Sequence, residues 1–427
     1  MLIIFDLDGT LYRTDVALAQ SVIRAASEVN LPHPDARAIV AAIGDTMDDF
    51  CRFLYPDSDP ETLRSFRRRV SFWERELIPS VGVPYDGVRE MIKELRSMGH
   101  RPVICTNGSL EYATIALSAL HLADMFEAVE ANRGESQKAE LVARLLSKFP
   151  DEAKLIVGDR KHDVEAAGIH NVPSIGVTYG YGREEPHRAN FTADTPADIV
   201  SLVCQCAVFA GIADDLAREA PTGGAVIGVN GVDASGKTTF ARSLCTYLRA
   251  CGRNTQLIHL DDFHNPREVR RRGSDEIDAY IHNAFNLELL VDELLAPAKE
   301  GREVNRELML LDIDTDRPSV PRTFHIDREG IVVLEGVLLY REPLDSFFTY
   351  RVFLDIAFDE VLRRAAARDI PKYGEGFLDR YRRKYIPIQQ WYLDTHHPKG
   401  RCDLVIDNND PRRPEVMLRR PDSLTDS

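Results

Sequence analysis

Short runs of consecutive apolar residues alternate along the chain with longer stretches of helical periodicity. Runs of this kind are typical of strands that are buried on both faces, and their alternation with helices is typical of parallel sheets. The runs lie at 2–5, 102–105, 154–157 and 174–177 in the first half, and at 225–229, 256–260, 331–334, 350–354 and 404–406 in the second. The pattern predicts an α/β protein with two doubly wound parallel-sheet domains.

Three stretches that break the alternation define the domain plan. Between about 14 and 84 no strand pattern occurs, so we expect a helical insert, a cap, in the first domain. The segment Pro221-Thr222-Gly223-Gly224 predicts a linker, and the helix before it fits either side. We therefore assign residues 1–204 to the first domain and 205–427 to the second. The tail from Asp410 is rich in Pro, Arg and Asp and is expected to be frayed.

Composition narrows the classes of protein that fit. The 427 residues are 44% hydrophobic and 28% charged, as in a soluble globular protein. The formal net charge of −15 disfavours general binding to nucleic acid or to an anionic membrane. No apolar run approaches the roughly 20 residues that span a bilayer, and the chain starts without a basic segment typical of signal peptides. The seven scattered cysteines predict neither a disulfide framework nor a zinc site, which favours the cytoplasm.

Residues suited to phosphate chemistry follow the strands of the first half. Ligands bind at the carboxyl ends of parallel strands, so we expect these side chains to share one site. The set combines acids, a hydroxyl and a cation: Asp6, Asp8, Thr106, Lys138, Asp159 and Asp163. One carboxylate can attack phosphorus, a second can transfer protons, and carboxylates can hold Mg²⁺. Taken singly, each residue also fits a cap, a turn or a solvated lysine; their order after successive strands favours catalysis.

This set resembles the haloacid-dehalogenase-like phosphohydrolases with a helical cap, of the phosphoglycolate phosphatase type. The resemblance covers residues 1 to about 200 and implies Asp6 as nucleophile and Asp8 as general acid/base. It implies that Thr106 and Lys138 bind the phosphoryl group. It also implies Mg²⁺ bound by Asp6, Asp8, Asp159 and Asp163. Thr10, which follows Asp8-Gly9, is usual in the phosphatases and favours them over the related phosphomutases.

A glycine-rich loop follows the first strand of the second half. Residues 231–238 fit Gly-x-x-x-x-Gly-Lys-Thr and stand between a strand and a helix, the context that this motif needs. The backbone N–H groups of such a loop cradle phosphates, while Lys237 reaches the transferring phosphate and Thr238 binds Mg²⁺. We expect ATP to contact Gly231, Asp233, Ala234, Ser235, Gly236, Lys237, Thr238 and Thr239.

Charged residues further along complete this second site. Asp261 offers a base for a substrate hydroxyl, and Glu335 offers a carboxylate on the Mg²⁺ side. The basic segment 363–369 predicts a lid whose arginines close on the triphosphate. Read alone, these features are also consistent with a capped turn, a strand-end acid and a solvated helix face, respectively.

Residues from about 222 to 409 resemble the uridine kinase, phosphoribulokinase and pantothenate kinase group, with uridine kinases nearest. The motifs that carry it are Asp261-Asp262-Phe263, Glu335-Gly336 and Arg368-Asp369. The resemblance implies Asp261 as general base, Glu335 as an acid at or beside Mg²⁺, and Arg368 as a lid arginine.

The acceptor end departs from that family. Leu311 and Asp316 stand where uridine kinases keep a tyrosine and a histidine that line the nucleoside pocket. Tyr280 stands where they keep an aspartate that contacts ribose. The resemblance therefore supports the phosphate end of the site and leaves the acceptor open.

The sequence thus predicts a bifunctional enzyme, a phosphatase fused to an ATP-dependent kinase, with Mg²⁺ at both sites and ATP as donor. The expected partners are a small phosphorylated metabolite and a small alcohol, with no membrane. One alternative is a polynucleotide end-processing kinase-phosphatase, because the basic runs 270–272 and 380–384 could follow a backbone; the net charge argues against it. The other is a regulatory sensor with one inactive site, although no expected catalytic residue is missing. Both substrates and the oligomeric state remain open.

Overall fold

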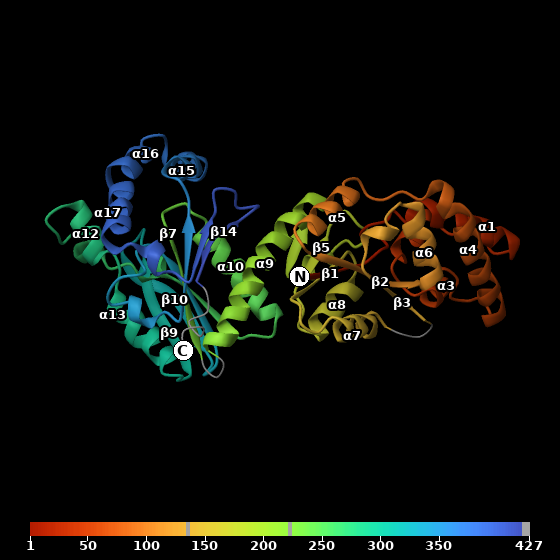
Figure 1. Cartoon of the computed structure of the whole chain (residues 1–427), viewed down its shortest axis with the longest axis horizontal. Coiled ribbons are helices and arrows are strands. Elements are labelled where there is room, and N and C mark those ends of the chain that lie inside the picture. Colours follow the sequence, from red (N-terminus) through yellow and green to blue (C-terminus); the bar gives the residue numbers. More distant parts are fainter. Residues whose placement is uncertain (134–136, 221–223, 421–427) are drawn as a thin grey trace. The chain divides into compact units, whose positions relative to one another are not determined.

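The computed structural model describes residues 1–133, 137–220 and 224–420 (Figure 1). The chain divides into two compact units, Met1–Val203 and Cys204–Ser427. Each unit is a mostly parallel sheet with flanking helices, which confirms the predicted α/β class with two such sheets. Of the predicted linker, residues 221–223 lie outside the described part of the chain.

The first unit is built on a sheet in the order β3-β2-β1-β4-β5-β6, with every neighbouring pair parallel. Its strands are β1 Leu2–Phe5, β2 Arg101–Ser109, β3 Val129–Asn132, β4 Lys154–Gly158, β5 Ser174–Val177 and β6 Phe191–Ala193. The flanking helices are α5 Val88–Ser97, α6 Leu110–Ala119, α7 Lys138–Lys148 and α8 Lys161–Ile169. The apolar runs did not indicate β3 and β6, because these are short edge strands of mixed polarity.

The predicted helical cap follows β1 and consists of α1 Asp15–Glu28, α2 Ala36–Ala41, α3 Met47–Leu54 and α4 Pro60–Val81. It has a hydrophobic core of its own, formed around Val22, Phe50, Phe66 and Val70. The longest helix, α4, starts where the Asp59 side chain accepts hydrogen bonds from the next turn, and it packs against α1 and α6 (Figure 1). A separately packed cap can present side chains to the strand ends without interrupting the sheet.

The second unit contains a sheet in the order β14-β13-β12-β7-β11-β8. Its strands are β7 Ala225–Gly231, β8 Thr255–His259, β11 Ile331–Gly336, β12 Tyr350–Asp355, β13 Leu404–Asp407 and β14 Glu415–Arg419. All neighbours are parallel except β13 and β14. The main helices are α10 Lys237–Ala250, α12 Glu276–Asn283, α15 Phe358–Tyr373 and α17 Ile386–His396.

Two features of this unit differ from the sequence-based expectation. The tail from Asp410 was expected to be frayed, which is wrong for 415–419: β14 pairs with β13, and Arg419 Nη2 lies 2.8 Å from Asp215 Oδ2. Every residue of β14 is exposed, although Val416, Met417 and Leu418 form a short apolar run that was not assigned to a strand. The segment 311–317 lies in a hairpin of β9 Val304–Asp312 and β10 Arg317–Ile326, also largely exposed.

One helix contradicts the expectation that no apolar run approaches membrane-spanning length. Helix α9, Pro196–Glu219, contains an 18-residue window with a mean hydropathy of 1.7, long and apolar enough to span a membrane by length and composition alone. In the structure 61% of that window is buried inside the protein. Buried core helices of ordinary proteins have the same composition.

Candidate active sites

The first candidate site lies at the carboxyl ends of β1 and β4. Phe5 pairs with Val157, so Asp6 and Asp159 leave neighbouring strands at the same edge. Between them Gly9 takes φ 75° and packs against the Asp159 carboxylate, where a Cβ atom would not fit. The local fold therefore places two acids together because the strands are parallel and in register.

Lys138 joins these acids from the first turn of α7. Its Nζ atom lies 2.6 Å from Asp6 Oδ1 and 2.9 Å from Asp163 Oδ1, and all three side chains are buried. Burial alone would lower the pKa of Lys138, but Asp163 and Asp6 raise it above its ordinary value. Lys138 therefore stays protonated and neutralises part of the buried negative charge.

The three acids Asp6, Asp159 and Asp163 fit a divalent cation. Each offers a carboxylate oxygen, and these oxygens lie within 4.8 Å of one another. Oxygen ligands in this number are what Mg²⁺ prefers. Burial, with Asp163 adding to it, raises the pKa of Asp6 well above its ordinary value and that of Asp159 to about 7. A cation bound among these carboxylates would favour their ionised forms and so lower both pKa values.

Asp8 stands apart from this group of three acids. Its Oδ1 atom accepts hydrogen bonds from Thr14 Oγ1 and from Tyr112 Oη, each at 2.5 Å. Burial raises the pKa of Asp8, while these two hydrogen bonds oppose the rise. The arrangement fits a proton-transferring carboxyl. Asp8 was also predicted to bind the metal, but its side chain is not part of the cluster formed by Asp6, Asp159 and Asp163.

Thr106, the predicted phosphoryl-binding hydroxyl, is buried near the end of β2. Its Oγ1 atom accepts a hydrogen bond from Gly108 N at 3.0 Å, and it also helps to stabilise the Asp8 carboxylate. The next residue, Asn107, donates from Nδ2 to the carbonyl of Gly44 in the cap at 2.9 Å. The β2 end thus provides the hydroxyl and links the sheet to the cap.

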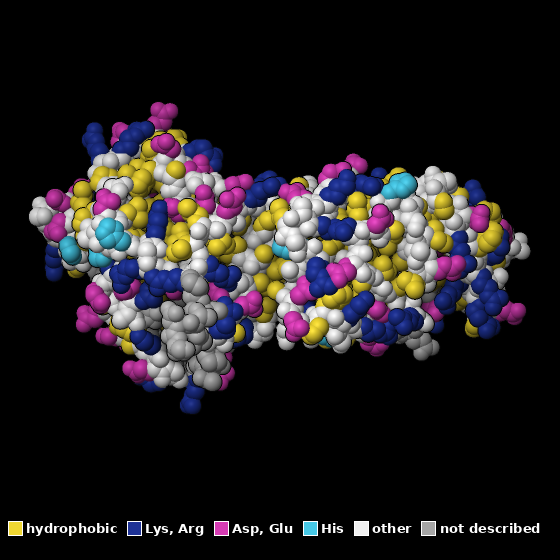
Figure 2. Space-filling view, viewed as in Figure 1, with side chains coloured by type: hydrophobic (Ala, Val, Ile, Leu, Met, Phe, Trp, Pro, Cys, Tyr) yellow, Lys and Arg dark blue, Asp and Glu magenta, His cyan; other side chains and the backbone are white. Residues whose placement is uncertain are grey.

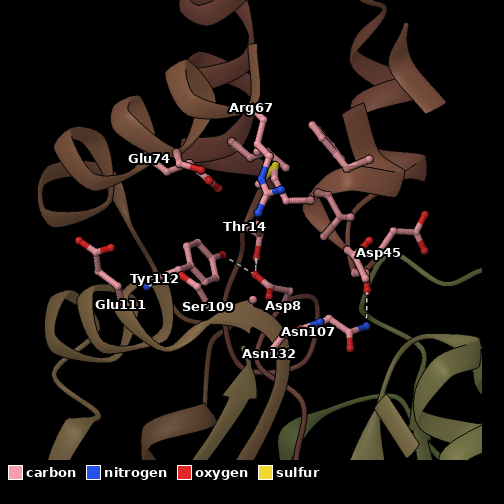
Figure 3. Close-up of a pocket in the computed structure, with 18 of the residues that line it drawn as sticks. Asp8, Thr14, Asp45, Arg67, Glu74, Asn107, Ser109, Glu111, Tyr112 and Asn132 are labelled. Carbon is pink, nitrogen blue, oxygen red and sulfur yellow. Dashed lines mark hydrogen bonds between the residues drawn. The ribbon is translucent and has the colours of Figure 1, made fainter. Parts of the chain in front are cut away.

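A cavity of about 540 Å³ opens between the cap and the carboxyl ends of the strands (Figure 3). Asp6 and Asp8 lie in its wall, together with Tyr112 from α6 and Glu74 from α4. Glu74 is only 4% exposed. Burial, together with the charge of Asp8, raises the pKa of Glu74 to about 8. No motif indicated Tyr112 or Glu74, because their nearness to Asp8 depends on how α4 and α6 pack.

The second candidate site is the glycine-rich loop between β7 and α10. Ala234 and Gly236 take left-handed φ values of 56° and 91°, and Lys237 starts α10. The Lys237 Nζ atom donates to the carbonyl of Val232 within the loop at 2.8 Å. The loop therefore has the tight turns and the lysine position of a phosphate cradle at a helix N-terminus.

The structure brings Thr238 and Glu335 together. Thr238 Oγ1 donates to Glu335 Oε1 at 2.9 Å, and His259 Nδ1 lies 2.7 Å from the same oxygen. Burial alone would raise the pKa of Glu335. The hydrogen bond with His259 and the charge of Lys237 have the larger combined effect, so the pKa of Glu335 is lowered. The hydroxyl and carboxylate fit Mg²⁺, which takes few protein ligands beside nucleotide phosphates. His259 carries no motif and was not predicted.

The remaining predicted residues surround Asp233. Its backbone N–H donates to Gln389 Oε1 at 3.0 Å. Burial raises the pKa of Asp233. The charge of Lys237 lowers this pKa, that of Asp261 raises it, and that of Arg368 lowers it. Because all three charges affect Asp233, they lie in the same region of the second unit. Asp261 is exposed after β8, as a base for an incoming hydroxyl must be.

The predicted lid arginine, Arg368, contacts residues of its own helix α15 and of the helical segment Tyr381–Tyr385. Arg368 pairs with Asp369 at 2.8 Å and donates to Tyr381 Oη at 2.7 Å. Arg364, one turn earlier on α15, contacts the loop instead, donating to the Ala234 carbonyl at 3.3 Å and to the Asn408 carbonyl at 2.6 Å. The family resemblance implied Arg368 as the lid arginine, whereas in the structure Arg364 is the one that donates a hydrogen bond to the loop. Of the other expected ATP contacts, Ser235 is buried and Thr239 exposed on α10.

At the acceptor end, the two residues that depart from uridine kinases lie on the β9–β10 hairpin. Asp316 occupies its turn with φ 57° and accepts hydrogen bonds at Oδ1 from Arg267 N at 2.8 Å and Arg270 Nη2 at 3.3 Å. Leu311 is half-buried on β9. Tyr280 lies close to Asp233 and Asp261, whose charges add to burial in raising its pKa.

Comparison with known proteins identifies both units. Residues 3–177 match the haloacid dehalogenase-like hydrolase family, and residues 226–384 match the phosphoribulokinase / uridine kinase family. A phosphoglycolate phosphatase from Haemophilus influenzae (strain 86-028NP) is 30% identical over 200 residues, 43% of this chain and 88% of the relative. The chain belongs to the haloacid dehalogenase-like hydrolases through residues 3–177, and it carries a phosphoribulokinase/uridine kinase family domain in 226–384.

Two further similar proteins were found. The tyrosine-protein kinase PtkA from Mycobacterium tuberculosis (strain ATCC 25618 / H37Rv) is 27% identical over 210 residues, 47% of this chain and 68% of the relative. A solved structure described as a possible uridine kinase from Bacillus stearothermophilus is 26% identical, with a TM-score of 0.35; the match covers 43% of this chain and 89% of that one.

Proposed function

We propose that the chain is a bifunctional enzyme that combines a Mg²⁺-dependent phosphomonoester hydrolase with an ATP-dependent kinase for a small alcohol. The observation that carries the proposal is the buried cluster in which Lys138 contacts both Asp6 and Asp163. The Thr238–Glu335 contact beside the glycine-rich loop supports the second activity. When bound, Mg²⁺ supplies positive charge that offsets repulsion between phosphate and its attacking group at either site.

In the hydrolase, an Asp6 oxygen attacks phosphorus and the bond to the ester oxygen breaks. Asp8 gives its proton to the departing alcohol, which leaves an aspartyl-phosphate. Asp8 then takes a proton from water, whose oxygen attacks phosphorus and releases inorganic phosphate, restoring Asp6. Lys138 holds Asp6 in place and offsets charge that builds on the phosphoryl oxygens. The cap excludes bulk water while this happens.

In the kinase, Asp261 accepts the proton of the acceptor hydroxyl, and the alkoxide oxygen attacks the γ-phosphorus of ATP. The bond to the β-phosphate oxygen breaks, giving ADP and a phosphomonoester. Lys237 follows the migrating phosphoryl group. Arg364 and Arg368, on the lid helix, provide cations near the loop.

The direct test uses the full chain with Mg²⁺. Phosphate release from p-nitrophenyl phosphate tests the hydrolase, and ADP formation with nucleosides, sugars and vitamins tests the kinase. A folded protein that hydrolyses no phosphomonoester would contradict the first half, and one that phosphorylates no alcohol would contradict the second. Because a relative is named as a tyrosine-protein kinase, phosphate transfer to protein tyrosine belongs in the same screen.

We propose no nucleic-acid or membrane partner. On the face drawn in Figure 2, Lys/Arg and Asp/Glu side chains are interspersed, whereas a backbone-binding groove needs a continuous basic track. Within the described part of the chain no disulfide bond joins the seven cysteines, Cys51, Cys105, Cys204, Cys206, Cys245, Cys251 and Cys402, which supports a reducing compartment such as the cytoplasm.

A further inference from the structure

We propose that Glu74 is a specificity-determining residue of the hydrolase, and that it selects phosphomonoesters with a hydroxyl group beyond the ester oxygen, as in polyol and sugar phosphates, over those with a carboxylate. The inference rests on the proposed hydrolase function and names the substrate class of that site.

The position of Glu74 on α4 is unusual for an acid. Phe66, Val70, Leu77 and Ile78 are buried on the same helix, so Glu74 lies on its buried apolar face. Burying a carboxyl group costs free energy unless it finds a polar partner. In Figure 3 the Glu74 side chain projects from the cap helix into the pocket, on the side that Tyr112 and Asp8 face from below.

Glu74 has no partner of its own within the described part of the chain: its side chain makes no hydrogen bond or ion pair there. Two arginines that the cap contributes to the pocket wall are already paired, while a third wall arginine, Arg133, follows β3 and lies outside the cap. Arg67 contacts Asp48 at 2.6 Å, and Arg75 contacts Glu111 at 2.6 Å. The polar group that the cap holds ready for a ligand is therefore a carboxyl.

The chemistry of that carboxyl decides what it can bind. A hydroxyl both donates and accepts hydrogen bonds, so it pairs with Glu74 whether the carboxyl is ionised or protonated. A substrate carboxylate only accepts, so it can pair with Glu74 only when that carboxyl is protonated, and it would add an anion to a cavity that already contains Asp6 and Asp8. The cavity of about 540 Å³ is in the usual range of roughly 300–1,000 Å³ for small-molecule sites. It has room for several carbons beyond the phosphate.

The test compares three substrates of the full-length enzyme with Mg²⁺. Glycerol 3-phosphate and 3-phosphoglycerate share one carbon skeleton and differ in a terminal hydroxymethyl or carboxylate, while p-nitrophenyl phosphate has neither group. We expect the wild type to prefer glycerol 3-phosphate over 3-phosphoglycerate in kcat/KM. Glu74→Leu should lower kcat/KM for glycerol 3-phosphate by about 10- to 100-fold, mainly through KM, because one hydrogen bond is lost. Hydrolysis of p-nitrophenyl phosphate should stay within about twofold.

Two further variants make the result decisive. Glu76→Leu removes an exposed glutamate from the same helix and should change nothing. Glu74→Gln keeps the shape and the hydrogen bonding but cannot ionise, so it should retain the hydroxyl substrate and should gain on 3-phosphoglycerate above about pH 8, where wild-type Glu74 is ionised. It carries the test if the leucine variant does not fold. A wild type that prefers 3-phosphoglycerate, or a Glu74→Leu variant that loses all three activities equally, overturns the inference. Absence of p-nitrophenyl phosphate hydrolysis in the wild type overturns the hydrolase itself.

Discussion

Lys138 and Asp6 face each other across the first site, with Nζ and Oδ1 2.6 Å apart in a buried environment. The same ammonium group lies 2.9 Å from Asp163 Oδ1, so one cation serves the candidate nucleophile and an acid of the metal cluster at once. This sharing orients Asp6 and keeps repulsion between the acids from opening the site. We therefore expect Lys138 to contribute to both activity and stability.

Replacing Lys138 by Met tests this directly. Two buried acids would lose their counter-charge, so we expect kcat for p-nitrophenyl phosphate to fall by about 10²–10³. The free energy of unfolding should fall by about 3–5 kcal/mol, as when one partner of a buried ion pair is removed. Kinetics and urea unfolding check the two effects, with kinase activity as the control for the second unit. Unchanged kcat and stability would remove Lys138 from the site.

The two activities should be separable by single substitutions. Asp6→Asn removes the nucleophile and should abolish phosphate release while leaving ATP-dependent phosphorylation intact. Lys237→Ala should do the reverse, because the cation that follows the migrating phosphate is lost. Measuring phosphate release and ATP-dependent phosphorylation for each of the two variants tests whether the activities are separate. If either substitution silences both activities in a folded protein, the two-site proposal is wrong.

Metal removal should stop both reactions. The first site offers three carboxylates, and the second a hydroxyl and a carboxylate, a ligand set that suits Mg²⁺ better than Zn²⁺. EDTA should abolish phosphate release and phosphorylation, and Mg²⁺ should restore them. Recovery with Zn²⁺ but not with Mg²⁺ would contradict the assignment.

Glu74 should make the first unit less stable as the pH rises. Its pKa is raised from 4.5 to about 8 by burial and by Asp8, so between these values the folded state holds a proton that the unfolded state has released. The protonated form of Glu74 therefore contributes to the free energy of unfolding at low pH, and this contribution is lost as the pH increases from about 4.5 to 8. Relative to wild type, the Tm of Glu74→Gln should rise between pH 5 and pH 8.

Tryptophan fluorescence can follow this effect. The chain has two tryptophans, Trp73 beside Glu74 in the cap and Trp391 in the second unit. A Trp391→Phe background therefore reports unfolding of the cap alone. Glu76→Gln, exposed on the same helix, is the matched control. A Tm difference that does not depend on pH would show that Glu74 does not titrate in this range.

Uridine should be a poor acceptor for the kinase. A pyrimidine carbonyl needs a hydrogen-bond donor, yet Leu311 is apolar and the Asp316 carboxylate is engaged by Arg267 and Arg270. A site built to pair a substrate's polar groups discriminates by up to ~10⁴–10⁵ against a ligand that leaves them unpaired. Steady-state kinetics provide the check. Uridine turned over with kcat/KM of ~10⁴ M⁻¹s⁻¹ or more would restore an ordinary uridine kinase.

The strands predicted from the sequence are those whose continuous apolar runs stand between turn signals and helical stretches. Strands β6 and β10 have no such run, because they are exposed on at least one face. Strands β9 and β14 do contain short apolar runs, at 308–311 and 416–418, but several of these side chains are exposed and the runs were not assigned to strands. Their positions depend on backbone pairing with strands far away in the chain.

The candidate sites also contain some residues that local sequence could predict and others that depend on distant packing. Residues inside a local motif, such as Asp6 and Thr238, could be found because strand ends and glycine turns place them. Tyr112 and Glu74 could not, since each reaches Asp8's surroundings from a helix whose packing no short motif encodes. His259 was also missed, although it pairs in register with Glu335 on the neighbouring strand. Only a correct strand order, β11 beside β8, would have indicated it.

The ion pair between Asp215 and Arg419 has a consequence for how such a protein can be assembled. It joins the part of α9 that belongs to the second unit to β14, the last strand of that unit, and the two residues are 204 positions apart in the chain. A domain whose first and last elements are neighbours can be appended to another gene, or circularly permuted, without threading through its own core. The second unit thus has the layout of a portable module, and its boundary for recombinant work falls after Arg419 rather than at the proline-rich segment before β14.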